Sequence, residues 1–261
     1  MNKLYKNAVL FGRIVRLESM RYLHYPLEFV AALVNRFAAI ILLAMFWYIV
    51  GAHGDGNLDS RFLLSYYLVI GGLSQLSFAE LGNASSVLKK IKYGQLTADL
   101  TRPIDTYFFQ YARHIGWQVQ FYLVSLALMI AGVLYGGGSI SPFMATLAIA
   151  NMFLINTAFN MLVASIGFYV VEASGIKNTL QHALRLLQGF LIPISLMPVF
   201  FQELLFSSPF ASSLYIPAVV LLGQDIEFSK LLIGSLWGLI LVWFARRVWL
   251  RSLRRYEAIG L

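Results

Sequence analysis

The sequence predicts an all-α integral membrane protein, and three observations lead to this prediction. Of the 261 residues, 59% are hydrophobic and only 12% are charged, whereas a soluble domain usually carries about 25% charged residues. The mean hydropathy is +0.71, so a soluble fold of this length would expose large apolar patches. The apolar residues also occur in long runs, as helices that cross the hydrocarbon core of a bilayer require.

Six segments are apolar enough to be transmembrane helices, since a bilayer is crossed by about 20 residues of helix. We place them at about 27–50, 62–78, 115–134, 143–171, 186–198 and 231–248. The fourth is long enough to tilt or to extend beyond the membrane. The fifth is the weakest, because Gly189 and Pro193 interrupt it. Residues 27–261 are therefore predicted to form one six-span transmembrane domain.

The basic residues are distributed unevenly between the two sides of this arrangement. Seventeen of the 20 Lys and Arg residues fall in segments on one side. Arg61 and Lys230 fall on the other side, and Arg36 lies inside the first span. Because cytoplasmic loops are enriched in Lys and Arg, both termini are predicted to lie in the cytoplasm. The net charge of +8 then reflects membrane topology, and we expect no nucleic-acid partner.

Residues 1–26 form an amphipathic segment that precedes the first span. On a helix, one face carries Leu4, Ala8, Phe11 and Val15, and the opposite face carries Lys6, Arg13 and Arg16. Such a helix lies along the membrane surface with its cations near anionic headgroups. We expect either an elbow helix that packs against the side of the transmembrane domain, or a positive anchor that only orients the first span.

The basic stretch between the second and third spans has the pattern of short helices. Ser85 or Ser86 is a candidate N-cap for a helix that runs to Lys92 and ends at Gly94. A second short helix stops before Pro103, because proline disfavours helix at the residue preceding it. The pattern predicts a compact cytoplasmic knob, and the alternative is a solvated basic loop.

Three stretches of the chain resemble type-2 permeases of ATP-binding-cassette transporters, in particular a bacterial subgroup of about this length. The first is IKYGQLTADLTRPID at residues 91–105. The second is GFLIP at residues 189–193, followed by prolines at 198, 209 and 217. The third is RYEAIG at residues 255–260. Together with the order of the spans, the resemblance extends over nearly the whole chain.

The resemblance implies a non-catalytic permease that forms half of the translocation pathway of an exporter. In this family a separate cytoplasmic ATPase binds a coupling helix between spans two and three, which assigns residues 87–102 to the ATPase contact. ATP and Mg would be bound by that partner, and we expect no cofactor and no metal in this chain. The assigned residues are Leu88, Lys89, Lys90, Ile91, Gly94, Leu96, Asp99, Leu100 and Arg102.

Within this contact we expect Lys89, Lys90 and Arg102 at the rim, and Leu88, Leu96 and Leu100 in the packed centre. The sequence contains no G-x-x-x-x-G-K-[S/T] motif, so the chain lacks the usual loop that holds nucleotide phosphates. If ATP drives this protein, a partner must therefore supply the nucleotide site.

The prolines at 198, 209 and 217 divide residues 200–222 into apolar pieces that are too short to cross a bilayer. The resemblance implies that these pieces are re-entrant segments in the outer leaflet, which are tolerated only where protein or a wet cavity covers the backbone. The alternative is an ordinary outer loop with a hydrophobic surface. Candidates for closing the exit are Phe200, Phe201, Phe206 and Phe210.

Five polar residues in or near the spans are candidates for the pathway or a gate. Arg36 is expensive at membrane depth and either pairs with another helix or contacts an anionic cargo. Asn156 and Asn160 lie four residues apart on one helix face and either bond to another helix or line the pathway. Glu172 and Arg185 are predicted to pair across spans four and five, as an interfacial ion pair or as a gate.

These expectations describe a multi-pass protein of the bacterial inner membrane. Its partners would be ATPase subunits, membrane lipid and a second permease, in a homodimer or a related heterodimer. We expect an amphipathic cargo such as a drug, lipid, peptide or glycan-linked molecule.

The alternative function is an ion-gradient-driven carrier or channel, but such proteins usually carry acidic residues near the midplane of the membrane. Here the acids lie at span ends or in loops, as do Glu28, Glu80, Glu172 and Glu203.

Overall fold

The computed structural model describes residues 3–20, 26–53, 59–77, 79–170 and 172–256, and within these ranges it contains helices and turns but no strand. The predicted all-α class is therefore confirmed. Four helices are long and apolar enough to cross a membrane: α2 (Pro26–His53), α6 (Thr106–Gly136), α7 (Pro142–Ile166) and α12 (Phe228–Leu253). Two others, α3 (Ser60–Leu76) and α8 (Ala173–Leu187), are shorter.

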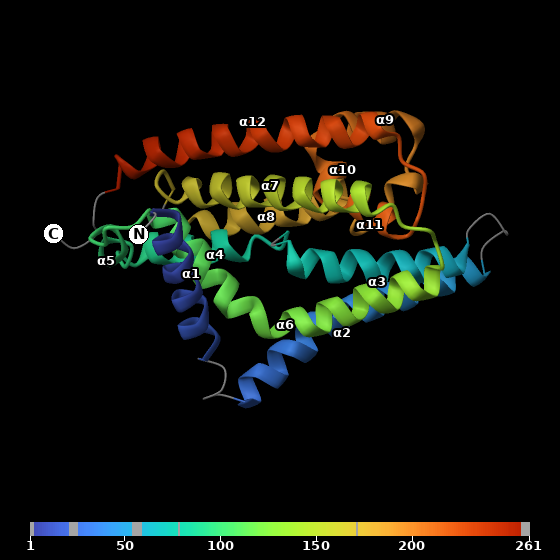
Figure 1. The fold of residues 1–261 in the computed structure, drawn as a ribbon, viewed down its shortest axis with the longest axis horizontal. Coiled ribbons are helices and arrows are strands. Elements are labelled where there is room, and N and C mark those ends of the chain that lie inside the picture. Colours follow the sequence, from blue (N-terminus) through green and yellow to red (C-terminus); the bar gives the residue numbers. More distant parts are fainter. Residues whose placement is uncertain (1–2, 21–25, 54–58, 78, 171, 257–261) are drawn as a thin grey trace.

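The long helices run lengthwise through the molecule in two groups (Figure 1). In one group α7 packs against α12, and in the other α3 packs against both α6 and α2. Local sequence signals set the helix ends. Asp59 and Asp105 cap α3 and α6 by accepting hydrogen bonds from the amides of Arg61 and Phe108, each at 2.9 Å. Gly137 ends α6 in the left-handed conformation, with φ of 70°, as glycine often does after a helix.

The structure corrects the predicted fifth span. Residues 186–198 do not form one helix: α8 ends at Leu187, Gly189 adopts φ of 79°, and only the short 3₁₀ helix η2 (Ile194–Leu196) follows. The left-handed conformation of Gly189 breaks the helical hydrogen-bond pattern. The helix in this part of the chain, α8, therefore ends before Gly189 and Pro193. The third span also begins earlier than predicted, at Thr106. Residues 78 and 171, at the ends of two predicted spans, lie outside the described residues.

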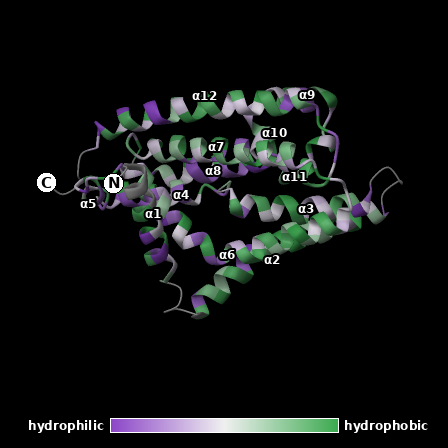
Figure 2. Cartoon of the chain, viewed as in Figure 1, coloured by the Kyte–Doolittle hydropathy of each residue, from purple (hydrophilic) through white to green (hydrophobic). Residues whose placement is uncertain are grey.

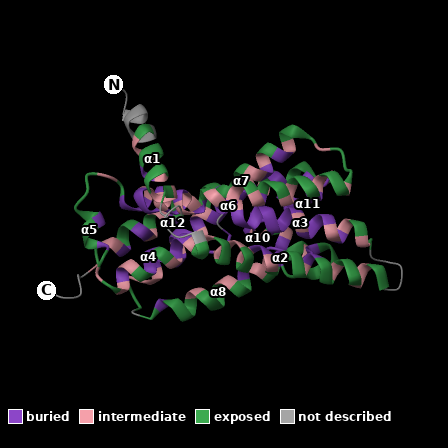
Figure 3. Ribbon diagram, turned by 90° about the horizontal axis from the view of Figure 1, so that it is seen from below, coloured by how far each residue is buried: buried purple, intermediate pink, exposed green. Residues whose placement is uncertain are grey.

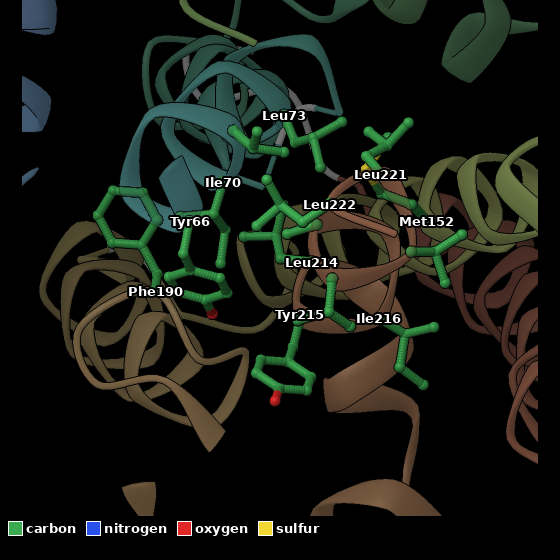
Figure 4. Packing of buried hydrophobic residues seen from close by; sticks show 14 of the residues in the cluster. Tyr66, Ile70, Leu73, Met152, Phe190, Leu214, Tyr215, Ile216, Leu221 and Leu222 are labelled. Carbon is green, nitrogen blue, oxygen red and sulfur yellow. The ribbon is translucent and has the colours of Figure 1, made fainter. Parts of the chain in front are cut away.

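After η2, three short helices occupy the region between the prolines: α9 (Val199–Ser207), α10 (Pro209–Ser213) and α11 (Tyr215–Leu221). Every residue from 211 to 222 is buried. Figure 4 shows this segment in the hydrophobic core, where Leu214 and Tyr215 lie near Tyr66 and Phe190. This burial argues against an ordinary outer loop for α10 and α11, whereas α9 is largely exposed.

The N-terminal helix α1 (Lys3–Ser19) packs across α6. Ile14 is buried against Phe109 and Ala112 of α6. The contact is close because Gly116 has no side chain: a Cβ atom there would lie 2.6 Å from the carbonyl oxygen of Val15. The side chains of Leu4, Lys6 and Ala8, which belong to the predicted amphipathic faces, lie outside the part of the chain described in atomic detail.

Hydropathy varies along the long axis of the molecule. Hydrophobic residues dominate the middle of the long helices, and hydrophilic residues gather on α1, on α8 and in the last turns of α12 (Figure 2). The helix α1 and the end of α12 lie at the same end of the molecule (Figure 1). Arg61, at the start of α3, and Lys230, at the start of α12, belong to the opposite end.

Candidate functional site

The predicted knob between the second and third spans consists of α4 (Gly82–Lys92) and α5 (Thr97–Leu100). The predicted serine cap is wrong, because α4 begins before both serines and Leu81 precedes it in the left-handed conformation, with φ of 50°. The cap comes from α7 instead: Asn160 Oδ1 accepts a hydrogen bond from the amide of Ala84 at 3.1 Å. A distant side chain thus takes the role that an N-cap residue usually has.

The inner face of α4 packs on the C-terminal end of α7. Val87, Leu88 and Ile91 are buried there. Gly167, just past the end of α7, permits this approach, since a Cβ atom at that position would lie 2.6 Å from Leu88 Cδ2 and 3.1 Å from Ile91 Cδ1. The knob is therefore attached to α7 by apolar packing as well as by the Asn160 cap.

The turn after α4 depends on Gly94, which adopts φ of 69°. A residue with a side chain adopts a positive φ only at a cost in conformational energy, so glycine is favoured at this position. The turn directs Leu96 into the hydrophobic cluster that contains Tyr107 and Trp249, and Leu96 is completely buried. The predicted stop of α4 at Gly94 agrees with this geometry.

Asp99 is the polar centre of the knob. Its carboxylate accepts hydrogen bonds from Lys90 Nζ at 2.6 Å and from Gln110 Nε2 at 2.5 Å, and Arg102 Nε lies 3.9 Å away. Burial lowers the pKa of Lys90, and the hydrogen bond to Asp99 offsets part of this effect. One carboxylate thus joins α4, α5 and α6.

The outward face of the knob differs from the predicted contact. Leu88 and Leu96 pack inside the chain, and the side chain of Lys90 is largely buried against Asp99. Of the residues assigned to the contact, Lys89, Leu100 and Arg102 are exposed, and the neighbouring Tyr93 is exposed as well. Tyr93 is 66% exposed, and the sequence analysis did not assign it to the contact. Its position directly after the end of α4, inside the motif, was a signal that could have identified it.

The predicted pair between Glu172 and Arg185 is wrong. Glu172 accepts a hydrogen bond from Lys92 Nζ at 2.5 Å, and Arg185 pairs with Glu80. The prediction placed the two residues on different spans, but Glu172 directly precedes α8 and Arg185 lies in its last turn. At a rise of 1.5 Å per residue, the length of the helix separates them by about 20 Å. The Lys92 pair raises the pKa of Lys92 and links the end of α4 to the start of α8.

Asn156 and Asn160 lie on one face of α7, as predicted, and bond to neighbouring elements. Asn160 Nδ2 donates to the carbonyl of Asn156 at 2.9 Å, and Asn156 Nδ2 donates to the carbonyl of Ser213 on α10 at 2.8 Å. Gln188, just past α8, donates to Asn156 Oδ1 at 3.3 Å. The pair therefore connects the knob, α7, α10 and the end of α8 through buried amides.

The remaining pathway candidates separate into two places. Arg36 and Arg185 line one cavity of about 710 Å³, between α1, α2, α3, α4, α6 and α8. Arg36 donates to Gln118 Oε1 at 2.5 Å, and its guanidinium lies 4.3 Å from the ring centre of Phe121. Phe200 and Phe201 are exposed on α9, at the other end of the molecule from α4 (Figure 1).

Comparisons with known proteins agree with the resemblance. A family model described as ABC-2 family transporter protein matches residues 33–260. A search of curated proteins finds no match to the chain. Because the family model extends over most of the sequence and includes the knob, the chain belongs to the ABC-2 family of transporters and is a permease component of an ABC transporter.

Proposed function

We propose that this chain is the permease subunit of an ATP-driven exporter, and that the outward face of α4 and α5 is where its ATPase binds. In this proposal α2, α3, α6, α7 and α12 are transmembrane helices, α8 and the segment that follows it supply the remaining crossing, α1 is the elbow helix, and α9 to α11 are re-entrant segments. The observation that carries the proposal is the rigid attachment of the knob, through Asp99 to α6 and through Asn160 to α7.

A movement of the ATPase must reach the membrane helices if ATP is to drive transport. The partner would hold ATP and Mg, and this chain would perform no covalent chemistry. ATP-dependent closure of the ATPases would favour one of two packings of the permease, because a ligand shifts an equilibrium only through its different affinity for the two states. The bonds of Asp99 and Asn160 support direct transfer of such a movement to α6 and α7.

The proposed topology places α1, the knob and the end of α12 in the cytoplasm, with the chain in the bacterial inner membrane. The basic residues at this end support that orientation. A second permease, identical or related, would complete the pathway. Apolar side chains exposed on the long helices support contact with lipid or with that second permease, as do Val34, Leu42 and Phe46 on α2 and Leu123 on α6.

The ATPase contact is tested by removing the exposed apolar side chains of the knob, with the double variant Tyr93→Ala, Leu100→Ala. Truncation of central aromatic residues often weakens an interface by about 2 kcal/mol. We therefore expect at least about tenfold less ATPase activity to co-purify with the tagged permease from its native membranes.

The matched control is Tyr135→Ala, because Tyr135 is also exposed but lies in the last turn of α6, at the opposite end of the molecule. Unchanged recovery of ATPase activity with the double variant would refute the assignment of the knob. Equal loss in the control would indicate an effect on folding instead of docking.

A further inference from the structure

The cavity of about 710 Å³ next to the knob has a lining of unusual charge. It lies between the ends of α1 and α3, the N-terminal half of α2, the first turns of α4 and α6, and the side of α8 that carries Lys177, Gln181 and Arg185. Two carboxylates line it, Glu18 and Glu80. Five cationic side chains line it as well: Arg36, Lys89, Arg113, Lys177 and Arg185. The lining therefore carries an excess of positive charge.

The two carboxylates already have cationic partners from the same lining. Arg113 Nε lies 2.5 Å from Glu18 Oε1. Glu80 pairs with Arg185 and also accepts a hydrogen bond from Gln181 at 2.8 Å. Arg185 Nε is buried and has no hydrogen-bond partner among the described residues. The local acids thus do not balance the cations, and the cavity favours an anion.

The helix α8 presents its polar side to this cavity. Lys177, Gln181 and Arg185 recur every four residues and line it, which places them on one face of the helix. Much of α8 is exposed (Figure 3), and the apolar Ile176 and Leu186 are among its exposed residues. Lys177 donates a hydrogen bond to Gln181 at 2.9 Å, so two cations and an amide of α8 meet the cavity beside the single carboxylate of Glu80.

Part of the cavity wall is apolar. Trp117, Ile40 and Phe190 contribute to it, and the guanidinium of Arg36 lies 5.3 Å from the ring centre of Trp117. On α2 the lining residue Ala39 is exposed, and the neighbouring Leu42 is exposed as well. An apolar chain therefore has a path from the cavity along α2.

We propose that this cavity binds the phosphate headgroup of an anionic amphiphile, with the apolar part of that molecule against Trp117 and α2. Phosphate suits the site better than a single carboxylate, because it presents more charge and more acceptor oxygens to several Arg and Lys side chains. The inference rests on the proposed function, since it names the chemical class of the cargo that this permease would take from the inner leaflet.

The test uses the full chain in detergent micelles, without an ATPase, and measures bound ligand by native mass spectrometry. The probes are dioctanoyl phosphatidic acid, dioctanoyl phosphatidylcholine and inorganic phosphate. We expect phosphatidic acid to bind about tenfold more tightly than either other probe, because loss of one strong charge-assisted contact changes affinity by about this factor.

The variants Lys177→Gln and Arg36→Gln should each weaken binding of phosphatidic acid about tenfold, for the same reason. Arg247→Gln is the matched control, since Arg247 stacks on Trp243 of α12 and does not line the cavity. A monodisperse elution profile of each variant verifies that it has folded.

Three outcomes would overturn the inference: equal binding of phosphatidylcholine, equal binding of inorganic phosphate, or unchanged binding in both cavity variants. Equal binding of inorganic phosphate would identify a site for soluble phosphate instead of an amphiphile. Because no ATPase is present, these results are independent of the knob experiment, so failure of one proposal is distinguishable from failure of the other.

Discussion

At the residue scale, a few buried polar side chains determine how the knob is held. Asp99 connects three helices, and Asn160 caps a helix that lies 76 residues earlier in the sequence. Buried hydrogen bonds of this kind matter because a donor left without a partner retains its full desolvation penalty. The sequence singled out both residues, but it did not indicate which atoms they bind.

The substitution Asn160→Leu removes the acceptor for the amide of Ala84 and leaves that buried amide without its bond. We expect α4 to lose about 1–2 kcal/mol of local stability, as for the loss of an N-cap. Hydrogen–deuterium exchange of residues 82–92 should become faster. Asn178→Leu, at an exposed position on α8, is the control, and equal exchange in the two variants would contradict the role of Asn160.

At the element scale, helix packing depends on where side chains are small. α1 approaches α6 at Gly116, and α4 approaches the end of α7 at Gly167. Sequence patterns predicted α1 from the helical period of its apolar residues, and they predicted α4 from signals for its two ends. They did not predict α8, whose polar residues recur every four positions and lower the hydropathy of the segment. That Lys177, Gln181 and Arg185 of this helix line a cavity is visible only in the fold.

The substitution Gly116→Ala tests the packing of α1. The added Cβ would lie within 3 Å of backbone atoms of Val15, so α1 must move, at about 1–3 kcal/mol for overpacking. Trypsin should then cleave faster after Arg13 and Arg16, which are exposed on α1. Gly175→Ala is the control, since no atom lies within 4 Å of a Cβ there. Cleavage at the same rate in both would show that the close contact is unimportant.

At the scale of the whole molecule, the two ends have different charge. α1, the knob and the last turns of α12 lie at one end (Figure 1) and carry most of the basic residues, whereas Arg61 and Lys230 lie at the starts of α3 and α12. The negative surface potential of the cytoplasmic leaflet attracts such basic segments. This distribution is the physical basis of the proposed orientation.

The orientation is testable with single cysteines, because the chain contains none. Ala98→Cys lies on α5 and Asp225→Cys lies between α11 and α12, both at exposed positions. A membrane-impermeant maleimide should label Asp225→Cys in intact spheroplasts and should label Ala98→Cys only after permeabilisation. Labelling of both cysteines from the same side would refute the topology.

The sequence by itself determined the class of the protein, most of its helices and the sorting of its charge. These properties follow from composition and from local periodicity, and both can be read from a segment without knowing which other segments it contacts. Only the tertiary structure decided that Arg185 pairs with Glu80, that Lys92 pairs with Glu172, and that α10 and α11 are buried. Such contacts join segments far apart in the chain, so they depend on how the helices pack and not on any local pattern.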